Sequence, residues 1–362
     1  MVSFATPQIS GNAGYVLRYY NGQIVQAIRD VNSSTLNLGN GFSAKIKFTI
    51  LESQMLSDFF AQNCKAPLFS QTSMSNLTFN EMYLVYNGEK FGMKAGKFYI
   101  SWGTSPLENP VSLVAPYDFT NIFDSPIQRS VLAFQTTLWY ENGSSLELDV
   151  IPAFSSDLFS GLESTIENVK STPKNVQFGV RYASFVGDYN VYLDAYHGFD
   201  HAFSVRNGTL YHAPLNAMGG EFSGPFPLDQ DFNMYAEAMA VFEKGGWNTR
   251  GVFGVNGFVF GSNAGTELER GLIGQNVLTP ENAITFYMNK DINGILSLNL
   301  MTSFGFEDEA KYGYLVHIDV DYQPIQDVSL EIGSTYSNGD EGEYFEKNSS
   351  YNGFYVETNV YF

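Results

Sequence analysis

Apolar and polar side chains alternate at single-residue spacing through many short stretches of the chain. Clear examples are residues 44–50, 146–150, 176–180, 296–300, 312–322 and 328–332. Because successive side chains of a strand point to opposite faces, each stretch predicts a strand with one apolar and one polar face. Soluble antiparallel sheets also alternate, but their polar faces do not need ionised groups at strand centres. Here Lys47, Asp149 and Asp319 lie mid-strand, which indicates a sheet with hydrocarbon on one side and enclosed water on the other.

The end of the chain carries the same alternation and stops on an aromatic side chain. Phe354, Val356, Thr358, Val360 and Phe362 share one face of the expected strand. This arrangement resembles the terminal assembly signal of bacterial outer-membrane β-barrels, in which a final Phe follows outward apolar residues at alternate positions. The resemblance implies that Phe354, Val356, Val360 and Phe362 engage the barrel-assembly machinery, and that the chain lies in outer-membrane lipid.

Short and long links alternate between the expected strands, counted back from Phe362. Fourteen strands are predicted, at 43–52, 75–87, 91–101, 129–141, 144–153, 175–187, 190–199, 231–243, 246–258, 281–290, 293–306, 310–323, 327–338 and 350–362. Two shorter candidates, 23–30 and 34–39, joined at Asn32 and Ser33, raise the count to sixteen. We predict an all-β, transmembrane, antiparallel up-and-down β-barrel of 16 strands, with 14 as the alternative, short periplasmic turns and long extracellular loops.

Length and composition fit a single barrel domain over residues 1–362. No linker or low-complexity run divides the chain, and no stretch reaches the roughly 18 to 20 consecutive apolar residues of a spanning helix. Residues 1–22 are expected to form an extended leader, the first strand or a small plug. Because neither a basic nor an apolar signal region follows Met1, we expect that this Met replaces a signal peptide.

Charge and aromatic content narrow the function classes. The chain has 38 acidic and 19 basic side chains and a formal charge of −19, which argues against nucleic-acid binding. Many of the 23 Tyr and 31 Phe residues fall near predicted strand ends, as aromatic girdles at two membrane interfaces require. The one cysteine, Cys64, excludes an intrachain disulfide and is expected to be a bystander thiol.

The link at 102–128 is long and contains prolines, and in the sixteen-strand count it is the third external loop. In this respect the chain resembles general bacterial porins, whose third loop folds into the lumen opposite basic wall residues. The resemblance implies an acidic half of Glu108, Asp118 and Asp124 and a basic half of Lys45, Lys47, Lys97, Arg129 and Arg181. A field between them would favour polar solutes over apolar ones. The alternative is an ordinary external loop.

A second resemblance covers residues 77–103. Glu81 and Tyr83 on one strand precede a Gly-basic-x-x-x-x-Trp-Gly motif that begins at Gly96 and Lys97 and ends at Trp102 and Gly103. This pair of strands resembles alginate-export and related substrate-specific porins. Glu81 and Lys97 are expected to pair across strands inside the lumen. The chain departs from an alginate exporter because it lacks a dense arginine ladder. General porins are trimers and alginate-export types are monomers, so a homo-trimer is only slightly favoured.

These features predict an outer-membrane porin with a water-filled channel for ions and small hydrophilic solutes. The expected inward set has nine acids, Glu81, Glu147, Asp149, Asp194, Glu237, Asp319, Asp321, Glu331 and Glu357, against six bases, Lys45, Lys47, Lys97, Arg129, Arg181 and Arg250. Weak cation selectivity is therefore expected. The alternatives are a substrate-specific channel for sugars or organic acids, and a non-conducting structural or adhesive barrel.

Enzymatic interpretations have little support in the sequence. His197 and His201 have a spacing that two metal ligands could use, but they lie where a strand meets a loop. His317 alternates with Asp319 and Asp321, yet no serine nucleophile can be tied to it. No phosphate-binding loop, dinucleotide fingerprint or paired-cysteine motif occurs. We therefore expect no enzyme activity, no cofactor and no metal.

Overall fold

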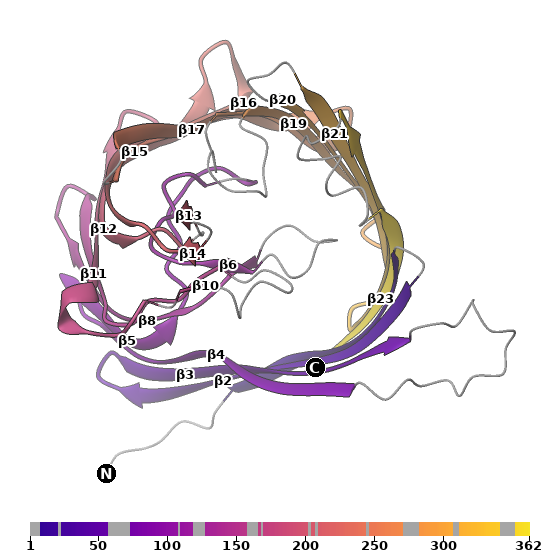
Figure 1. The fold of residues 1–362 in the computed structure, drawn as a ribbon, viewed down its shortest axis with the longest axis horizontal. Helices are drawn as coiled ribbons and strands as arrows, with labels where there is room; N and C mark the ends of the chain where they lie inside the picture. The colour runs from indigo at the N-terminus through magenta and orange to yellow at the C-terminus, as the bar shows by residue number, and fades with distance from the viewer. Residues whose placement is uncertain are drawn as a thin grey trace, which may run out of the picture.

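The chain forms a closed antiparallel β-barrel. The computed structural model describes residues 8–20, 23–56, 73–107, 109–118, 127–157, 166–167, 169–201, 204–206, 209–243, 246–270, 282–306, 311–340 and 352–362; Cys64 lies outside them. Eighteen strands make one sheet, which closes because the first strand pairs with the last. Figure 1 shows the ring that results. The expected all-β barrel is confirmed, but the expected count of sixteen, with fourteen as the alternative, is wrong.

The wall strands are β1 (Gln8–Tyr20), β2 (Gln23–Gly39), β3 (Phe42–Leu56), β4 (Ser73–Asn87), β5 (Phe91–Phe98), β8 (Val131–Trp139), β9 (Ser145–Ile151), β11 (Gln177–Val186), β12 (Tyr189–Phe199), β15 (Pro214–Phe226), β16 (Asp229–Glu243), β17 (Gly246–Val259), β18 (Ser262–Arg270), β19 (Asn282–Ile292), β20 (Leu296–Phe306), β21 (Tyr312–Ile325), β22 (Val328–Gly339) and β23 (Gly353–Tyr361). Each pairs with its neighbours in chain order. Among the described residues, no helix has the length and apolar character needed to cross a membrane.

Both ends of the described chain lie at the same end of the barrel. Gly11 of β1 and Phe362 exchange two backbone hydrogen bonds of 2.9 Å. The turn between β2 and β3 is at this end too, and its Gly39, Asn40 and Gly41 all have positive φ, a conformation for which Gly and Asn carry the least steric cost. We call this the short-turn rim and the opposite end the long-loop rim.

The N-terminal part of the chain contributes two strands that the sequence pattern did not resolve. Residues 8–20, expected as a leader, a first strand or a small plug, form β1 and close the barrel against β23. The two candidates at 23–30 and 34–39 are one continuous strand, β2, so the turn expected at Asn32 and Ser33 does not exist. The two residues pair with β3 without interruption, Asn32 opposite Phe48 and Ser33 opposite Lys47.

Two further strands lie in stretches that were expected to be long external loops. β15 falls within 200–230 and β18 within 259–280. β15 carries Gly219, Gly220, Gly224 and two prolines, which weaken its alternation and its strand propensity. Each added strand reverses the direction of the next one. The link between β16 and β17 therefore lies at the long-loop rim, not at the periplasmic side as expected.

The two faces of the wall differ as the alternation predicts. On β23, Phe354, Thr358 and Val360 are exposed and point outward, whereas Tyr355 and Glu357 are buried and point inward. Outward apolar residues are exposed on strand after strand, among them Leu84, Leu132, Phe178, Leu193, Met218, Phe253, Leu268, Phe286, Ile318 and Ile332. A continuous outward apolar surface is the feature by which a barrel fits a membrane.

Short strands lie inside the ring rather than in its wall. β6 (Tyr117–Asp118) pairs with β7 (Ile127–Gln128), and β14 (Thr209–Tyr211) joins β10 (Ile166–Glu167) to β13 (Ser204–Arg206). Figure 1 shows β6, β10, β13 and β14 within the barrel, toward the side of β5, β8 and β12. The chain that follows β5, β9 and β12 thus turns into the ring.

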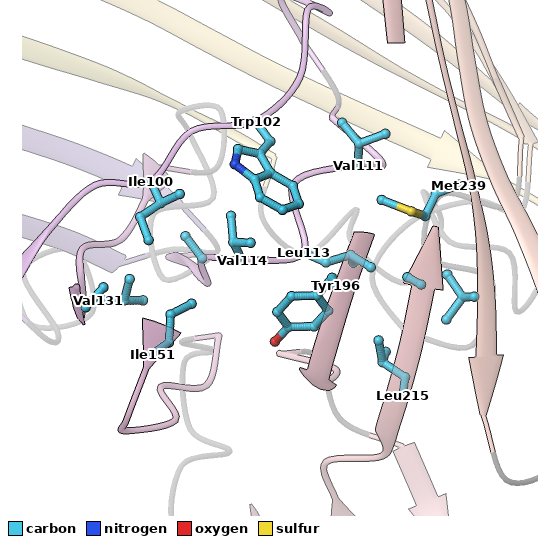
Figure 2. Packing of buried hydrophobic residues seen from close by; sticks show 14 of the residues in the cluster. Ile100, Trp102, Val111, Leu113, Val114, Val131, Ile151, Tyr196, Leu215 and Met239 are labelled. Carbon is cyan, nitrogen blue, oxygen red and sulfur yellow. The ribbon is translucent and has the colours of Figure 1, made fainter. Parts of the chain in front are cut away.

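A compact apolar cluster joins this inward chain to the wall. Its wall residues are Phe98, Val131, Ala133, Ile151, Tyr196, Leu215, Ala217, Met239 and Val241, and its remaining residues are Ile100, Trp102, Val111, Leu113, Val114 and Ala115. In Figure 2, Trp102, Val111, Leu113 and Val114 gather between Val131 and Ile151 on one side and Met239 on the other. We call residues 99–118 the inner loop. The apolar side chains of this loop are buried against the wall and thereby removed from water. This burial is the main driving force for the position of the loop.

Candidate functional site: the barrel interior

Four inward carboxylates from four wall strands hold the start of the inner loop. We call Glu147 of β9, Glu221 of β15, Glu237 of β16 and Glu267 of β18 the carboxylate clamp. The indole nitrogen of Trp102 donates to Glu147 at 3.0 Å. The backbone N–H of Gly103 donates to Glu221 at 3.2 Å. A carboxyl oxygen accepts hydrogen bonds in either protonation state, so each of these side chains can anchor the loop.

The next two residues of the loop engage the other half of the clamp. Glu237 accepts the backbone N–H groups of Thr104 and Ser105 at 2.5 and 2.6 Å. Glu267 accepts the hydroxyls of Ser105 and Tyr235, both at 2.7 Å. Glu237 and Glu267 are almost completely buried. A buried carboxyl group is costly unless donors replace the lost water. The loop backbone supplies them to Glu237, and the two hydroxyls supply them to Glu267.

Two glycines make the close approach of this segment possible. Gly103 has a φ of +109°, which L side chains rarely adopt, and a Cβ there would lie 1.9 Å from the side chain of Asn109. Gly179 of β11 lies beneath Trp102, and a Cβ there would be 3.0 Å from the indole ring. A side chain at Gly103 would clash with Asn109 and force the loop apart, and a side chain at Gly179 would press against the indole of Trp102.

Arg181 of β11 is the basic partner of the clamp. It bonds Glu221 at 2.8 Å, approaches Asp194 at 3.6 Å and lies 4.2 Å from the ring centre of Tyr192. Its Nη1 also donates to the carbonyl of Ser101 at 3.3 Å. The sequence placed Arg181 on the basic half of a constriction, opposite acids of the loop. Its partners in the structure are instead acids of the wall.

A second polar group ties the inner loop to the links that follow β9 and β12. Asp157 accepts the N–H of Tyr117 at 2.7 Å and donates its own N–H to the carbonyl of His201 at 3.0 Å. Arg129 donates to the carbonyl of Ser156 at 2.7 Å. Burial raises the pKa of Asp157 to about 7. The neutral carboxyl is therefore favoured where these three segments meet.

His201 lies at the same junction. Its Nδ1 is 2.6 Å from the carbonyl of Ser155, and its Nε2 is 3.0 Å from the carbonyl of Leu113. Burial lowers the pKa of His201 to about 4, although both carbonyls favour the charged ring. Because a neutral imidazole has one N–H, only one of the two carbonyls accepts a hydrogen bond from it at neutral pH. Acidification would allow both.

Arg250 faces inward, and the side chains of the expected acidic residues of the loop lie outside the described part of the chain. Arg250 of β17 pairs with Asp200 at 3.0 Å, at the long-loop rim. Glu108 and Asp124 lie outside the described residues. The backbone of Asp118 lies in β6, and its side chain is outside the described part. An acidic half made by the inner loop therefore remains a prediction.

The expected Glu81–Lys97 pair is not formed. Glu81 bonds Lys45 at 2.9 Å instead. The register places Lys97 opposite Met82 and Leu132, two exposed outward residues, and its Nζ donates to the carbonyl of Phe79. Lys97 is thus on the outer face and does not line the interior.

The register of β4 with β5 accounts for this difference, because Lys97 lies opposite Met82 and not opposite Glu81. A bulge lies nearby: the pairing of β3 with β4 shifts between Lys47 and Phe48, so Asn80 has no partner on β3 and the alternation of β4 changes phase there. Lys94 points inward in place of Lys97, with its Nζ 4.9 Å from the ring centre of Tyr83 and 4.6 Å from that of Phe98. No sequence signal marks the bulge.

The wall from β21 to β23 carries a row of carboxylates on its inner face. Asp321 lies directly opposite Glu331, and Glu331 directly opposite Glu357. Glu331 accepts the hydroxyl of Tyr355 and Glu357 accepts the amide of Asn359. We call these three residues the acidic row. Lys45 and Lys47 extend from β3, on the other side of β1 and β2.

The histidines do not form the metal or catalytic groups that were considered. His197 is exposed on the outer face of β12, whereas His201 is buried inside. His317 lies 3.2 Å from Asp319 and 2.8 Å from the hydroxyl of Thr335, within the wall. Among the residues that the structure describes, no three His, Cys, Asp or Glu side chains are arranged to hold a metal ion.

Comparisons with known proteins identify the fold. No family model and no curated protein matches the sequence. Solved structures do match over nearly the whole chain. OccAB3 of Acinetobacter baumannii is 11% identical, with a TM-score of 0.57 over 98% of both chains. OpdK of Pseudomonas aeruginosa, solved with vanillate, is 8% identical, with a TM-score of 0.60 over 98% of both chains. OprD of the same species is 8% identical, with a TM-score of 0.61 over 98% of this chain and 95% of that chain.

The chain has the fold of an outer-membrane porin. The expected architecture of an outer-membrane barrel is thereby confirmed. Of the expected interior residues, Lys45, Glu81, Glu147, Arg181, Glu237 and Arg250 face inward and have partners there. Sequence reasoning missed Glu221 and Glu267 because it missed β15 and β18. A charged residue next to an apolar one, such as Glu267 beside Leu268, was the available signal.

Proposed function

We propose that the protein is an outer-membrane channel for passive diffusion of ions and small hydrophilic solutes. The observation that carries the proposal is the closed wall of eighteen strands with exposed apolar side chains outside and charged or polar ones inside. Such a wall needs hydrocarbon around it, and a barrel of this strand number is wide enough for an aqueous interior. Purified protein should insert into planar bilayers and give discrete conductance steps. A barrel that inserts and stays closed would support the structural or adhesive alternative.

The inner loop is proposed to narrow this channel. Its apolar side chains pack on the wall from β5 to β16, and the carboxylate clamp fixes its first residues. This geometry supports a constriction with a fixed position, because the loop is tied at four points to separate strands. Liposome swelling with neutral sugars of increasing size would give the limiting diameter.

We also propose that the channel is weakly cation-selective, because some of the inward acids have no role in holding the loop. Four of the inward acids bond the loop, and Glu81 bonds Lys45. The acidic row remains on the wall, where the like charges of Asp321, Glu331 and Glu357 lie side by side. Carboxylates that line a pore favour cations. Reversal potentials in a salt gradient should have the cation sign, and neutralising the row (D321N, E331Q and E357Q together) should move them toward zero.

A channel for small organic acids is the second candidate. OpdK was solved with vanillate, an aromatic carboxylate. In this chain Lys47 points inward opposite Ser33 and Glu81, and it has no ion-pair partner among the described residues. A solute carboxylate could bind there. Swelling rates for benzoate-like anions well above those for neutral sugars of equal size would favour this candidate over simple diffusion.

We also propose that the barrel-assembly machinery recognises the last strand of the barrel. On β23 the exposed, outward Phe354, Val360 and Phe362 support recognition of this strand by the barrel-assembly machinery, and Val356 lies on the same face. Removing Phe362 should lower the yield of folded barrel in cells, and refolding of the purified chain in detergent should change little. A homo-trimer stays a prediction, which the mass of the detergent-solubilised protein tests.

A further inference from the structure

We propose that the outer face binds the phosphorylated headgroup of an outer-leaflet lipid through His197 and Asn216. The inference rests on the proposed membrane location and does not depend on conduction. Both residues are exposed. They lie directly opposite each other on β12 and β15, and Nδ1 of His197 bonds Oδ1 of Asn216 at 2.7 Å. Neither takes part in the interior described above.

The pair sits in the middle of an aromatic row that crosses five strands. The register runs from Phe178 of β11 to His197, to Asn216, to Phe242 of β16 and to Trp247 of β17, each residue directly opposite the next. Every member is within three residues of its strand's end at the long-loop rim. The three aromatic side chains are exposed, Trp247 by 69%. We call these five residues the outer row. Exposed aromatics at strand ends mark the depth of the lipid headgroups.

The pair has hydrogen-bonding capacity that the protein does not use. An amide oxygen can only accept, so the ring nitrogen Nδ1 of His197 must be the donor in this bond. That leaves Nε2 of the ring and the amide N–H groups of Asn216 without a partner among the described residues. Hydrocarbon cannot satisfy them, and an unmet polar group there is costly. When the ring carries one N–H, Nε2 can only accept, so a headgroup hydroxyl can donate to it while a phosphate oxygen accepts from the amide of Asn216.

The surroundings favour an anionic lipid over a protein partner. Two residues farther from the rim, the same face of these strands exposes Val180, Ala195 and Met218. The polar pair therefore lies at the edge of a lipid-facing apolar surface. By alternation, the outward positions of β11, β12, β15, β16 and β17 include no Asp or Glu, although the chain has a charge of −19. Lys170 and Lys174 are exposed just before β11, on the rim side of the row. A phosphate would meet the amide donors of Asn216 and the ammonium groups of the two lysines, and no carboxylate at the outward positions of these strands.

The test uses Trp247 as its reporter. Trp102 is buried, and Trp139 lies at the opposite rim and can be replaced by Phe. Protein in neutral detergent would be titrated with diphosphorylated lipid A, with the same lipid lacking its phosphates, and with a zwitterionic phospholipid, while Trp247 emission is followed. We expect saturable binding of the phosphorylated lipid, at least tenfold weaker binding of the other two, and at least tenfold weaker binding in H197A/N216A. T249A, which removes an exposed hydroxyl two residues from Trp247, should behave as the parent.

Two results would overturn the proposal. One is equal affinity of the parent and H197A/N216A for phosphorylated lipid A. The other is a change in oligomer mass of the double variant with lipid binding intact, which would assign the outer row to an interface between copies of this chain. Each variant must first run as a folded, heat-modifiable barrel. A failure of the proposed channel would appear separately, as absence of conductance.

Discussion

Two halves of the same wall use their inner faces in different ways. The half from β5 to β18, here the loop-bearing half, turns apolar residues such as Val131, Leu215 and Met239 inward against the inner loop. The other half, from β19 through β23 and β1 to β4, here the polar half, buries polar side chains instead, among them Thr285, Asp319, Thr335, Glu357 and Asn359. Both halves expose apolar side chains on their outer faces, and the difference lies in what covers their inner faces.

The comparison shows that an inward charge can have two roles. In the loop-bearing half, Glu237 and Glu267 bond the backbone and hydroxyl of the loop and are removed from water. In the polar half, Asp321 and Glu331 face carboxylates of neighbouring strands across the inner surface. Counting inward acids from the sequence treats both groups as one pore lining. Only the second group can act on a passing ion.

The largest effect is expected from Trp102→Ala. The indole is 1% exposed and fills the centre of the apolar cluster. Truncating a buried Trp costs about 3–5 kcal/mol, and here the loss falls on the packing of the inner loop. Single-channel conductance should rise and become noisier, while the barrel still folds. Tyr355→Ala, which removes an equally buried aromatic from the polar half, should lower thermal stability without raising conductance. Equal conductance changes in the two variants would remove the distinction between the halves.

Glu237→Ala should release the same loop with a smaller effect. The substitution leaves the N–H groups of Thr104 and Ser105 without their acceptor, at a cost of about 1–3 kcal/mol for each buried group. Conductance should rise, and protease cleavage within the inner loop should speed up. Glu331→Ala is the matched control in the polar half, where we expect a change in selectivity and none in loop cleavage. Cleavage that is unchanged in E237A would show that apolar packing alone holds the loop.

The sequence was sufficient for β19 to β23 of the polar half and insufficient for β1, β2 and much of the loop-bearing half. Strands such as β21 and β23 alternate strictly, because their outer faces contact lipid and their inner faces contact a polar interior along their whole length. β15 does not, since Gly219 and Gly220 interrupt it and Leu215 and Ala217 face an apolar loop. Whether a strand's inner face is wet or packed depends on where a distant loop folds. Alternation within the strand does not contain that information.

The same limit applies to single residues of the interior. The motif at Glu81 and Lys97 suggested a cross-strand pair by position alone. The register places Lys97 opposite Met82, one residue from Glu81, so the two side chains point to opposite faces. The clamp, by contrast, could be half predicted: Glu147 and Glu237 were expected inside. Their partners are backbone N–H groups and an indole, which no charge pattern indicates.

Acidification should act on the loop-bearing half through two opposing groups. The pKa of Asp157 is raised to about 7 by burial, so its contribution to packing is present at low pH and is lost as the pH rises to 7. The pKa of His201 is lowered to about 4 by burial, so its contribution is present above its ordinary value of about 6.5 and is lost below it. Between pH 7 and 5 each of these is worth about 2 kcal/mol, with opposite sign, at about 1.36 kcal/mol per pH unit of full titration.

Substituting either residue alone should reveal the pH dependence of the other, which the two cancel in the wild type. Wild-type loop packing should change little between pH 7 and 5. D157N should pack less well as the pH falls, because of these two groups only His201 still titrates, and H201Q should pack better. Amide hydrogen exchange of residues 109–118 measures both trends. The charges nearby, Asp200, Arg129 and Arg250, are present in all three proteins and cancel in the comparison. Parallel pH profiles for D157N and H201Q would contradict the assignment.

The smallest effect is expected on the reversal potential when Lys47 or Lys97 is neutralised. The sequence alone could not tell which of these two lysines points inward. Lys47 points into the interior, opposite Ser33 and Glu81, while Lys97 points outward beside Met82 and Leu132. Removing an inward positive charge leaves the acidic row less opposed, so K47Q should shift the reversal potential further in the cation direction. K97Q should leave it unchanged, because the wall separates that charge from the pore. An equal shift for both lysines would mean that β5 faces the other way, and with it the entry of the inner loop.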